Sequence, residues 1–66
     1  MRVHFDEQAD ALYLRLDDSA IVESEEVRPG VILDFNEQHQ VVGVELLRVA
    51  KRVPLASLKQ LDFEVA

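Results

Sequence analysis

The residues of this sequence that are capable of covalent or metal chemistry are few and scattered. Ser19, Ser24 and Ser57 could act as nucleophiles, but none lies in a G-x-S-x-G elbow, and the chain has no cysteine to serve instead. His4 and His39 have no partner at a metal-ligand spacing, and a metal site needs three or four convergent ligands. We therefore expect two ordinary histidines at or near the surface, no catalytic residue and no bound metal.

The acidic and glycine-containing segments also have simple structural interpretations. Asp6, Glu7 and Asp10 offer oxygen ligands for calcium but lack the glycine and the spacing of an EF-hand loop, so they predict a turn. Gly30 follows a proline in a turn, and Gly43 lies inside a strand, where it marks a bulge or a close approach. Neither glycine belongs to a phosphate-binding loop, so no cofactor is expected.

The balance of charge bears on the class of partner. The formal net charge is -6, from 13 acidic and 7 basic residues. Such a surface repels phosphate backbones, so a nucleic-acid partner is not expected. Arg48, Lys51 and Arg52 are a local exception that would share one face of a helical turn. They could contact phosphate, but such a group more often balances neighbouring acidic residues.

The size of the chain limits its core and favours self-association. A domain of 66 residues buries only about 60% of the surface that its unfolded chain exposes. Small cores are often supplemented by disulfides, metal or oligomerisation, and the absence of cysteine leaves oligomerisation as the usual route. We therefore expect a homo-oligomer. No segment approaches the roughly 20 apolar residues of a membrane-spanning helix or has a signal-peptide pattern, so a cytoplasmic protein is expected.

Alternating hydrophobicity predicts a mainly β (α+β) fold that forms a single domain over residues 1–66. Period-two alternation indicates a small antiparallel sheet of about four strands in two hairpins within residues 1–47: 2–6 with 11–16, and 31–35 with 41–47. Residues 48–66 form the C-terminal helix and tail. Pro54 begins a short helix with an apolar stripe at Leu55, Leu58 and Leu61, packed on one face of the sheet. Alternation after Gln60 leaves a final short strand as the alternative.

The two faces of the predicted sheet differ in character. Leu12, Leu14 and Leu16 share one face and are expected to form its core. The opposite face is too apolar for simple solvation and is where a partner is expected. Residues 21–28 form an edge strand or an extended arm, whose glutamates would discourage unwanted strand pairing or engage a partner. The candidate partner interface consists of Tyr13, Arg15, Glu23, Glu25, Glu26, Ile32 and Glu45.

Several segments occur in an order that closely resembles the bacterial domain-of-unknown-function 2283 family. They are F-D-E-Q-A-D-A-L-Y-L-R-L, V-E-S-E-E-V-R-P-G-V-I-L-D-F, V-V-G-V-E-L-L and A-K-R, from Val3 to about Arg52. Phe5 and Phe35 depart from the tyrosine common at these positions. The resemblance implies a small mainly-β domain with no established enzymatic activity, and it transfers no catalytic residue. The resemblance also implies a gene setting in which members of this family can lie beside small toxin-like proteins.

Three functions remain open on this basis. The favoured one is a non-catalytic protein-interaction module, with the antitoxin-like partner of a small basic toxin as its specific form, since negative charge would steer encounter with a basic protein. The first alternative is a self-assembling structural domain that binds no ligand. The second is a small enzyme with a site formed between subunits from Asp10, Tyr13, Asp34 and Glu45.

Overall fold

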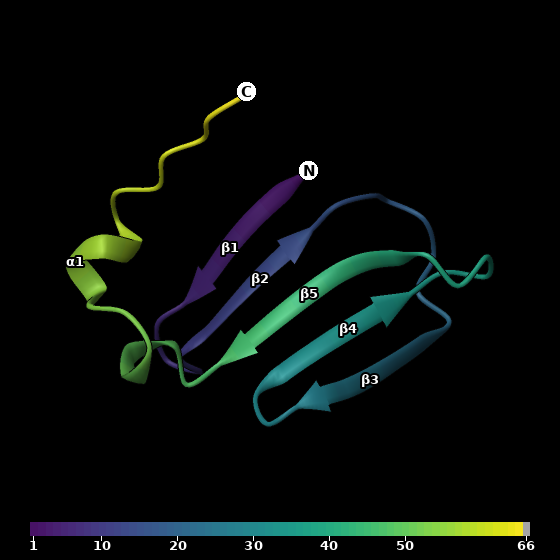
Figure 1. Ribbon diagram of the computed structural model, residues 1–66, viewed down its shortest axis with the longest axis horizontal. Coiled ribbons are helices and arrows are strands. Elements are labelled where there is room, and N and C mark those ends of the chain that lie inside the picture. Colours follow the sequence, from purple (N-terminus) through teal and green to yellow (C-terminus); the bar gives the residue numbers. More distant parts are fainter. Residues whose placement is uncertain (66) are drawn as a thin grey trace.

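The computed structural model describes residues 1–65 and consists of one five-stranded antiparallel sheet followed by a short C-terminal segment (Figure 1). The strands are β1 (Arg2–Asp6), β2 (Ala11–Arg15), β3 (Glu23–Arg28), β4 (Val31–Phe35) and β5 (Val41–Leu47). Their order in the sheet is β1-β2-β5-β4-β3, so the last strand in sequence lies in the middle. A 3-10 turn, η1 (Val49–Lys51), and the helix α1 (Leu55–Leu58) follow.

The mainly-β prediction is confirmed, but the sheet has five strands where about four were predicted. The additional strand is β3, so of the two alternatives for residues 21–28 the edge strand is confirmed and not the extended arm. It pairs with β4 in the register Glu25↔Leu33. The Pro29-Gly30 turn makes this pairing possible, because Gly30 has a backbone φ of 78°, a value that residues with a Cβ rarely adopt. The amide of Gly30 also donates to Glu26 Oε2 at 2.9 Å, so the strand and its turn stabilise each other.

Polar side chains shape the two other tight connections. Asp6 Oδ1 accepts hydrogen bonds from the amides of Gln8 and Ala9, as expected for a residue that forms a turn. Between β4 and β5 the buried Asn36 has the same role, since its Oδ1 accepts from the amides of Gln38 and Gln40 at 3.0 Å. These bonds satisfy backbone groups that the ladder does not pair, so each hairpin closes over a defined register.

The register places most of the larger apolar side chains on one side of the sheet, as the alternation predicted. Leu14 lies opposite Val44, which lies opposite Leu33, and equivalent pairs continue on either side. We call this side the apolar face and define it by Val3, Phe5, Leu12, Leu14, Val31, Leu33, Phe35, Val44 and Leu46. A register shift follows Asp34, opposite the start of β5, so the alternation of β5 is interrupted there.

The apolar face is not a closed core. Within residues 1–65 the buried hydrophobic residues are Ala11, Val42 and Val49. Leu12 and Leu14 are half-buried, and Leu16 is 39% exposed, so the expectation that these three leucines form the core is wrong for the single chain. The physical reason is that the sheet has no second layer over its centre.

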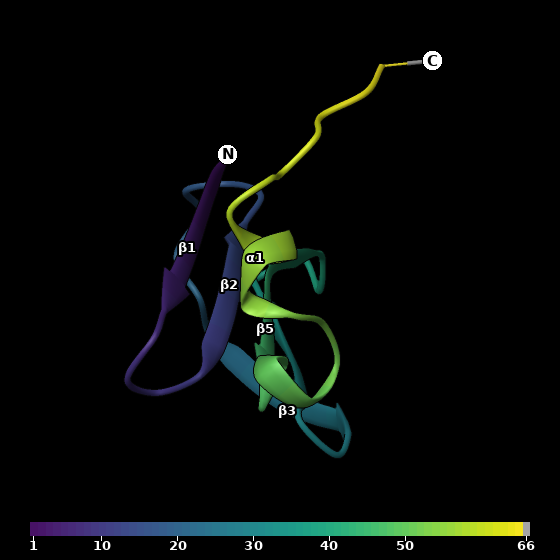
Figure 2. The same ribbon diagram turned by 90° about the vertical axis from the view of Figure 1, so that its left-hand side faces the viewer.

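The C-terminal segment covers one corner of the apolar face. Leu58 of α1 is half-buried and lines a hollow together with Val3, Phe5 and Leu12 of the first two strands. The predicted helical stripe is shorter than expected, because α1 has four residues and ends before Leu61. Residues 61–65 form neither helix nor strand. Leu61 and Asp62 still line the hollow beside the first two strands, and the chain then runs away from the sheet (Figure 2).

Candidate interaction site

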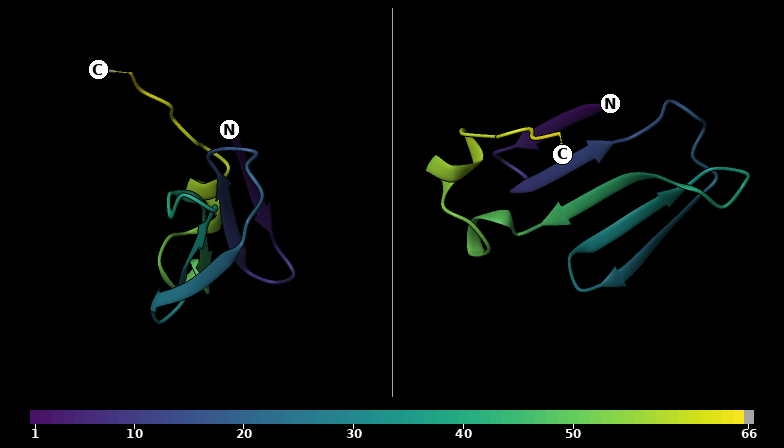
Figure 3. Two further views of the ribbon diagram at one scale, coloured as in Figure 1. Left: turned by 90° about the vertical axis from the view of Figure 1, so that its right-hand side faces the viewer. Right: turned by 45° about the horizontal axis from the view of Figure 1, so that its top comes forward.

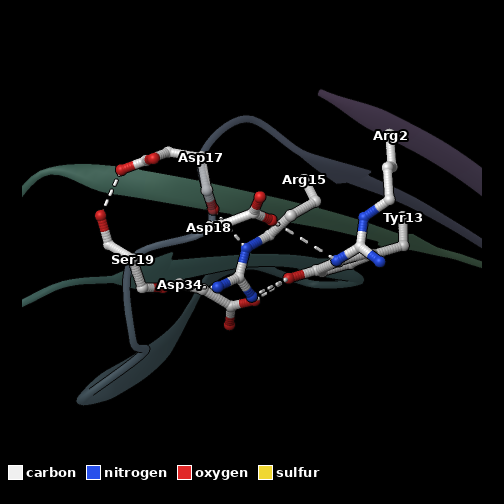
Figure 4. A network of polar contacts seen from close by, with 7 residues as sticks. All are labelled: Arg2, Tyr13, Arg15, Asp17, Asp18, Ser19 and Asp34. Carbon is white, nitrogen blue, oxygen red and sulfur yellow. Dashed lines mark hydrogen bonds and ion pairs between the residues drawn. The ribbon is translucent and has the colours of Figure 1, made fainter.

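A chain of polar contacts crosses the face of the sheet opposite the apolar face, which we call the polar face (Figure 4). Tyr13 Oη donates to Asp34 Oδ2 at 2.8 Å, and Ser24 Oγ donates to Asp34 Oδ1 at 2.6 Å. These bonds link β2, β4 and β3, and the first of them passes over the central strand β5. Both oxygens of the Asp34 carboxylate therefore accept hydrogen bonds from within the chain.

Gly43 on β5 makes this crossing possible. A Cβ at position 43 would lie 2.5 Å from Tyr13 Oη and 2.7 Å from Asp34 Oδ2, closer than real Cβ contacts. The sequence-based interpretation of this glycine as the site of a close approach is confirmed. The approaching groups are side chains of the two neighbouring strands.

Arg15 continues the polar contacts toward the loop that follows β2. Its guanidinium donates to the backbone oxygens of Asp17 and Ser19 and, at 3.4 Å, to Tyr13 Oη. Arg2 lies directly opposite Arg15 in the β1–β2 register and forms an exposed ion pair of 3.9 Å with Asp18. The carbonyl and carboxylate oxygens of this loop thus offset the repulsion between two facing arginines.

The same loop contains a carboxylate with a perturbed protonation equilibrium. The Ser19 hydroxyl donates to the Asp17 carboxylate, and this hydrogen bond lowers the pKa of Asp17 below its ordinary value. Backbone amides of residues 18 and 19 and the charge of Arg15 act in the same direction. The loop is therefore organised by the ionised form of Asp17.

The seven residues of the candidate partner interface fall on two sides of the sheet. One row of side chains crosses the polar face from β1 to β3. Its pairings are His4↔Tyr13, Tyr13↔Glu45, Glu45↔Ile32 and Ile32↔Glu26. Glu23 and Glu25 lie opposite Phe35 and Leu33, so they stand at the margin of the apolar face instead. The predicted interface is therefore two surfaces, and Tyr13 and Arg15 already have partners within the chain.

The residues considered for an enzyme site are brought together only in part. Tyr13, Asp34 and Glu45 share the polar face, but Asp10 lies in the turn before β2 with a different role. Its Oδ1 accepts from the amide of Ala50 at 2.9 Å, and its backbone oxygen accepts from the amide of Val49 at 3.2 Å. Asp10 thereby attaches the segment after β5 to the first hairpin.

The basic group at Arg48, Lys51 and Arg52 does not form the helical patch that its spacing suggested. Arg48 has a φ of 54° and stands before η1, while Arg52 follows that turn and donates to the backbone oxygen of Pro29 at 3.3 Å. Two of the three cations therefore adjoin the β3–β4 turn, where a Cβ at Gly30 would touch the Arg48 guanidinium.

Residues 1–65 contain no cluster of three His, Asp or Glu side chains arranged to hold a metal ion. No helix in that range has the length and apolar character needed to cross a membrane.

The outer edge of β3 is one of the two open edges of the sheet, and β1 forms the other. Glu23, Ser24, Glu25 and Glu26 are all exposed, and the strand pairs with β4 on one side only. Among the described residues neither Glu23 nor Glu25 takes part in an ion pair or a side-chain hydrogen bond. The outer backbone edge of β3, which borders the sheet in Figure 1, thus carries glutamates that have no ion-pair partner among the described residues.

Sequence reasoning missed the open centre of the apolar face. Val44 and Leu46 belong to the central strand of the sheet and are still only half-buried. One signal was available, since an apolar face of nine side chains cannot be covered by a helix of one or two turns. The alternation identifies the face but does not show whether the C-terminal segment is large enough to cover it.

These features define a class of protein: a small, single-layered antiparallel sheet that has one apolar face, a hydrogen-bonded polar face and an acidic open edge. The sequence profile of the family described as "Protein of unknown function (DUF2283)" matches residues 2–49, and the chain belongs to this family. The match covers all five strands and ends within η1. Neither a curated protein nor a solved structure shows significant similarity to the chain.

Proposed function

We propose that this protein is a non-catalytic interaction module that binds a small basic protein through the outer edge of β3. The observation that carries the proposal is the combination on one strand of an unpaired backbone edge and exposed glutamates without cationic partners. An extended segment of a partner can add to such an edge through main-chain hydrogen bonds, and its side chains then alternate between the two faces. Lysine or arginine opposite Glu23 and Glu25 would complete the pairing.

The charge of the whole chain supports a basic partner. A net charge of -6 speeds the encounter with a cationic protein and disfavours association with acidic ones. If the partner is a basic toxin that acts on RNA, an acidic module at its cationic surface would also block access of the phosphate backbone. The antitoxin-like role is the specific form of this proposal.

The contacts of the polar face support a non-catalytic role. Asp34 is hydrogen-bonded to both Tyr13 and Ser24, and Arg15 is directed at carbonyl oxygens of its own loop. These groups hold three strands and a loop together, which explains their presence without a substrate. The cytoplasmic location stays a prediction.

The experiment is a binding measurement with a charge-reversed edge and a matched control. The variant Glu23→Lys/Glu25→Lys changes the edge, and Asp17→Lys/Asp18→Lys makes the same change of charge in the loop after β2. Each tagged chain is used to purify partners from its native host at low and high salt. We expect a basic protein that the wild type and the loop variant retain, that the edge variant loses, and that high salt releases.

Two results would count against the proposal. Equal loss in both variants would show that net charge, and not the β3 edge, determines binding. Retention of the same partner by the edge variant would place the contact elsewhere on the sheet.

A further inference from the structure

The chain exposes more surface than a compact folded monomer of its size. The accessible surface is 5218 Å², whereas a folded monomer of 7.5 kDa is expected to expose about 4,200 Å². The radius of gyration is 12.7 Å, against about 11 Å for a compact domain of this length. The extended residues 61–65 and the open, single-layered sheet both contribute to the difference.

The excess of about 1,000 Å², to which residues 61–65 also contribute, is of the same order as the roughly 800 Å² that each partner buries in a standard stable interface. The side chains at the centre of the face are those that a second layer would cover. Leu14, Leu33 and Val44 adjoin one another across β2, β5 and β4 and are all half-buried, although they lie on the inner strands of a five-stranded sheet. The molecule is also thin, because its extent along the shortest principal axis is 20 Å, compared with 36 and 30 Å along the other two.

From these observations we infer that two copies of this chain pack their apolar faces together and form a two-layered β-sandwich. A two-fold axis brings the same patch of both copies into contact, so an apolar patch can complement itself without any new charge. The nine side chains that define the face are uncharged, and its β3 margin carries the charged residues Glu23, Glu25 and Arg28. Sheets packed in this way lie about 10 Å apart with interdigitating side chains. The pairing supplies the core that 66 residues cannot provide alone.

A second copy explains the face better than a basic protein partner does. No carboxylate projects from the strands β1, β2, β5 and β4 on this side, so the centre of the face offers nothing to lysine or arginine. The chain's own C-terminal segment reaches one corner, through Leu58, and then leaves the sheet (Figure 3). The inference goes beyond the proposed function because it uses a different surface and a different partner.

The first test is the mass in solution across a dilution series, measured by light scattering and sedimentation. We expect twice the mass of one chain at micromolar concentration. Val44→Asp places a charge at the centre of the face and should weaken association at least about 100-fold. Leu47→Asp, on the same strand but on the polar face, is the matched control and should leave the mass doubled. A wild-type monomer that persists at all concentrations would overturn the inference.

A second measurement keeps the inference testable if Val44→Asp does not fold. In a mixture of isotopically labelled and unlabelled wild-type chains, we expect intermolecular contacts between methyl groups of Leu14, Leu33 and Val44. Contacts from these methyls to Phe63 of the same chain would show that the C-terminal segment covers the face, and intermolecular contacts confined to the polar face would place the interface there. Either result would refute the sandwich.

Salt separates this inference from the proposed function. Two chains with a net charge of -6 repel each other, so higher salt should strengthen the apolar dimer. Binding of a basic partner at the β3 edge should become weaker under the same conditions. If the dimer does not respond to salt in this way, the salt dependence of binding at the β3 edge can still be measured, and the reverse also holds.

Discussion

Replacing Gly43 by alanine tests whether the hydrogen bond across the central strand organises the sheet. The new Cβ would lie 2.5 Å from Tyr13 Oη and 2.7 Å from Asp34 Oδ2, the two atoms that form this bond. Both atoms are at the ends of side chains, so they can move apart with little strain in the backbone. The main cost of Gly43→Ala is therefore the hydrogen bond and not a clash.

The expected magnitude follows from two opposing effects. A hydrogen bond to a charged group contributes about 1.5–3 kcal/mol to the free energy of unfolding. Alanine within a strand is favoured over glycine by about 0.5–1 kcal/mol, because glycine loses more conformational freedom on folding. Gly43→Ala should therefore lower the free energy of unfolding by about 1–2 kcal/mol, or about 1–2 M in the urea midpoint for a domain of this size.

The assay is urea unfolding followed by far-ultraviolet circular dichroism, at one fixed protein concentration for all variants. Tyr13→Phe removes the donor and keeps the ring, so it is the matched background for a double-mutant cycle. In that background Gly43→Ala should be neutral or slightly stabilising. An equal loss of stability with tyrosine and phenylalanine would refute the reasoning and assign the role of Gly43 to the nearby register shift in β4–β5.

Further predictions concern the turns and the loop after β2. Asp10→Ala should speed hydrogen exchange at the amide of Ala50, whereas Asp10→Asn, which keeps an acceptor, should leave it slow; equal rates would contradict the attachment of η1. Gly30→Ala should lower the free energy of unfolding by about 1–2 kcal/mol because the φ of 78° strains a residue with a Cβ, and no change in the unfolding midpoint would contradict this. In a carboxyl titration by nuclear magnetic resonance, the pKa of Asp17 should lie below its ordinary value and rise toward it in Ser19→Ala. Because the folded-state pKa of Asp17 is lowered, the stability that the Ser19–Asp17 hydrogen bond contributes is present above the unfolded-state pKa. It is lost as the pH falls through the folded-state pKa. If Ser19→Ala destabilised the protein equally at neutral and at low pH, this prediction would be wrong.

The strands were predictable because their side chains alternate with the period of the backbone. Four of them were located from residues such as Leu12, Leu14 and Val44, and their register follows from hairpin connections of ordinary length. β3 was harder to recognise because its exposed glutamates carry no apolar alternation. Its pairing depends on the Pro29-Gly30 turn and on the Glu26 hydrogen bond to that turn, which a local pattern does not show.

The candidate site was less predictable, because side-chain partners depend on the order of strands in space. Tyr13 and Asp34 are 21 positions apart and meet only because the last strand in sequence lies between theirs. The sequence suggests Tyr13 for a partner interface and both residues for an enzyme site between subunits, whereas the structure shows the two side chains bonded to each other within one chain. Conversely, of the leucines expected to form a core, Leu12 and Leu14 are half-buried and Leu16 is exposed, since a count of apolar residues does not reveal whether a second layer exists.

The β3 edge and the apolar face would bind their partners through different interactions, so binding at the two surfaces can be measured separately. The β3 edge offers backbone hydrogen bonds and negative charge, so its affinity should depend on the charge of the partner and fall with salt. The apolar face offers area without charge, so its affinity should depend on burial and make the stability of the fold dependent on protein concentration. Because Glu23 and Glu25 stand where the edge meets the margin of the face, a charge reversal there would also reduce the repulsion between two copies. The edge variant should thus lose the basic partner and strengthen the dimer, a combination that general unfolding cannot produce.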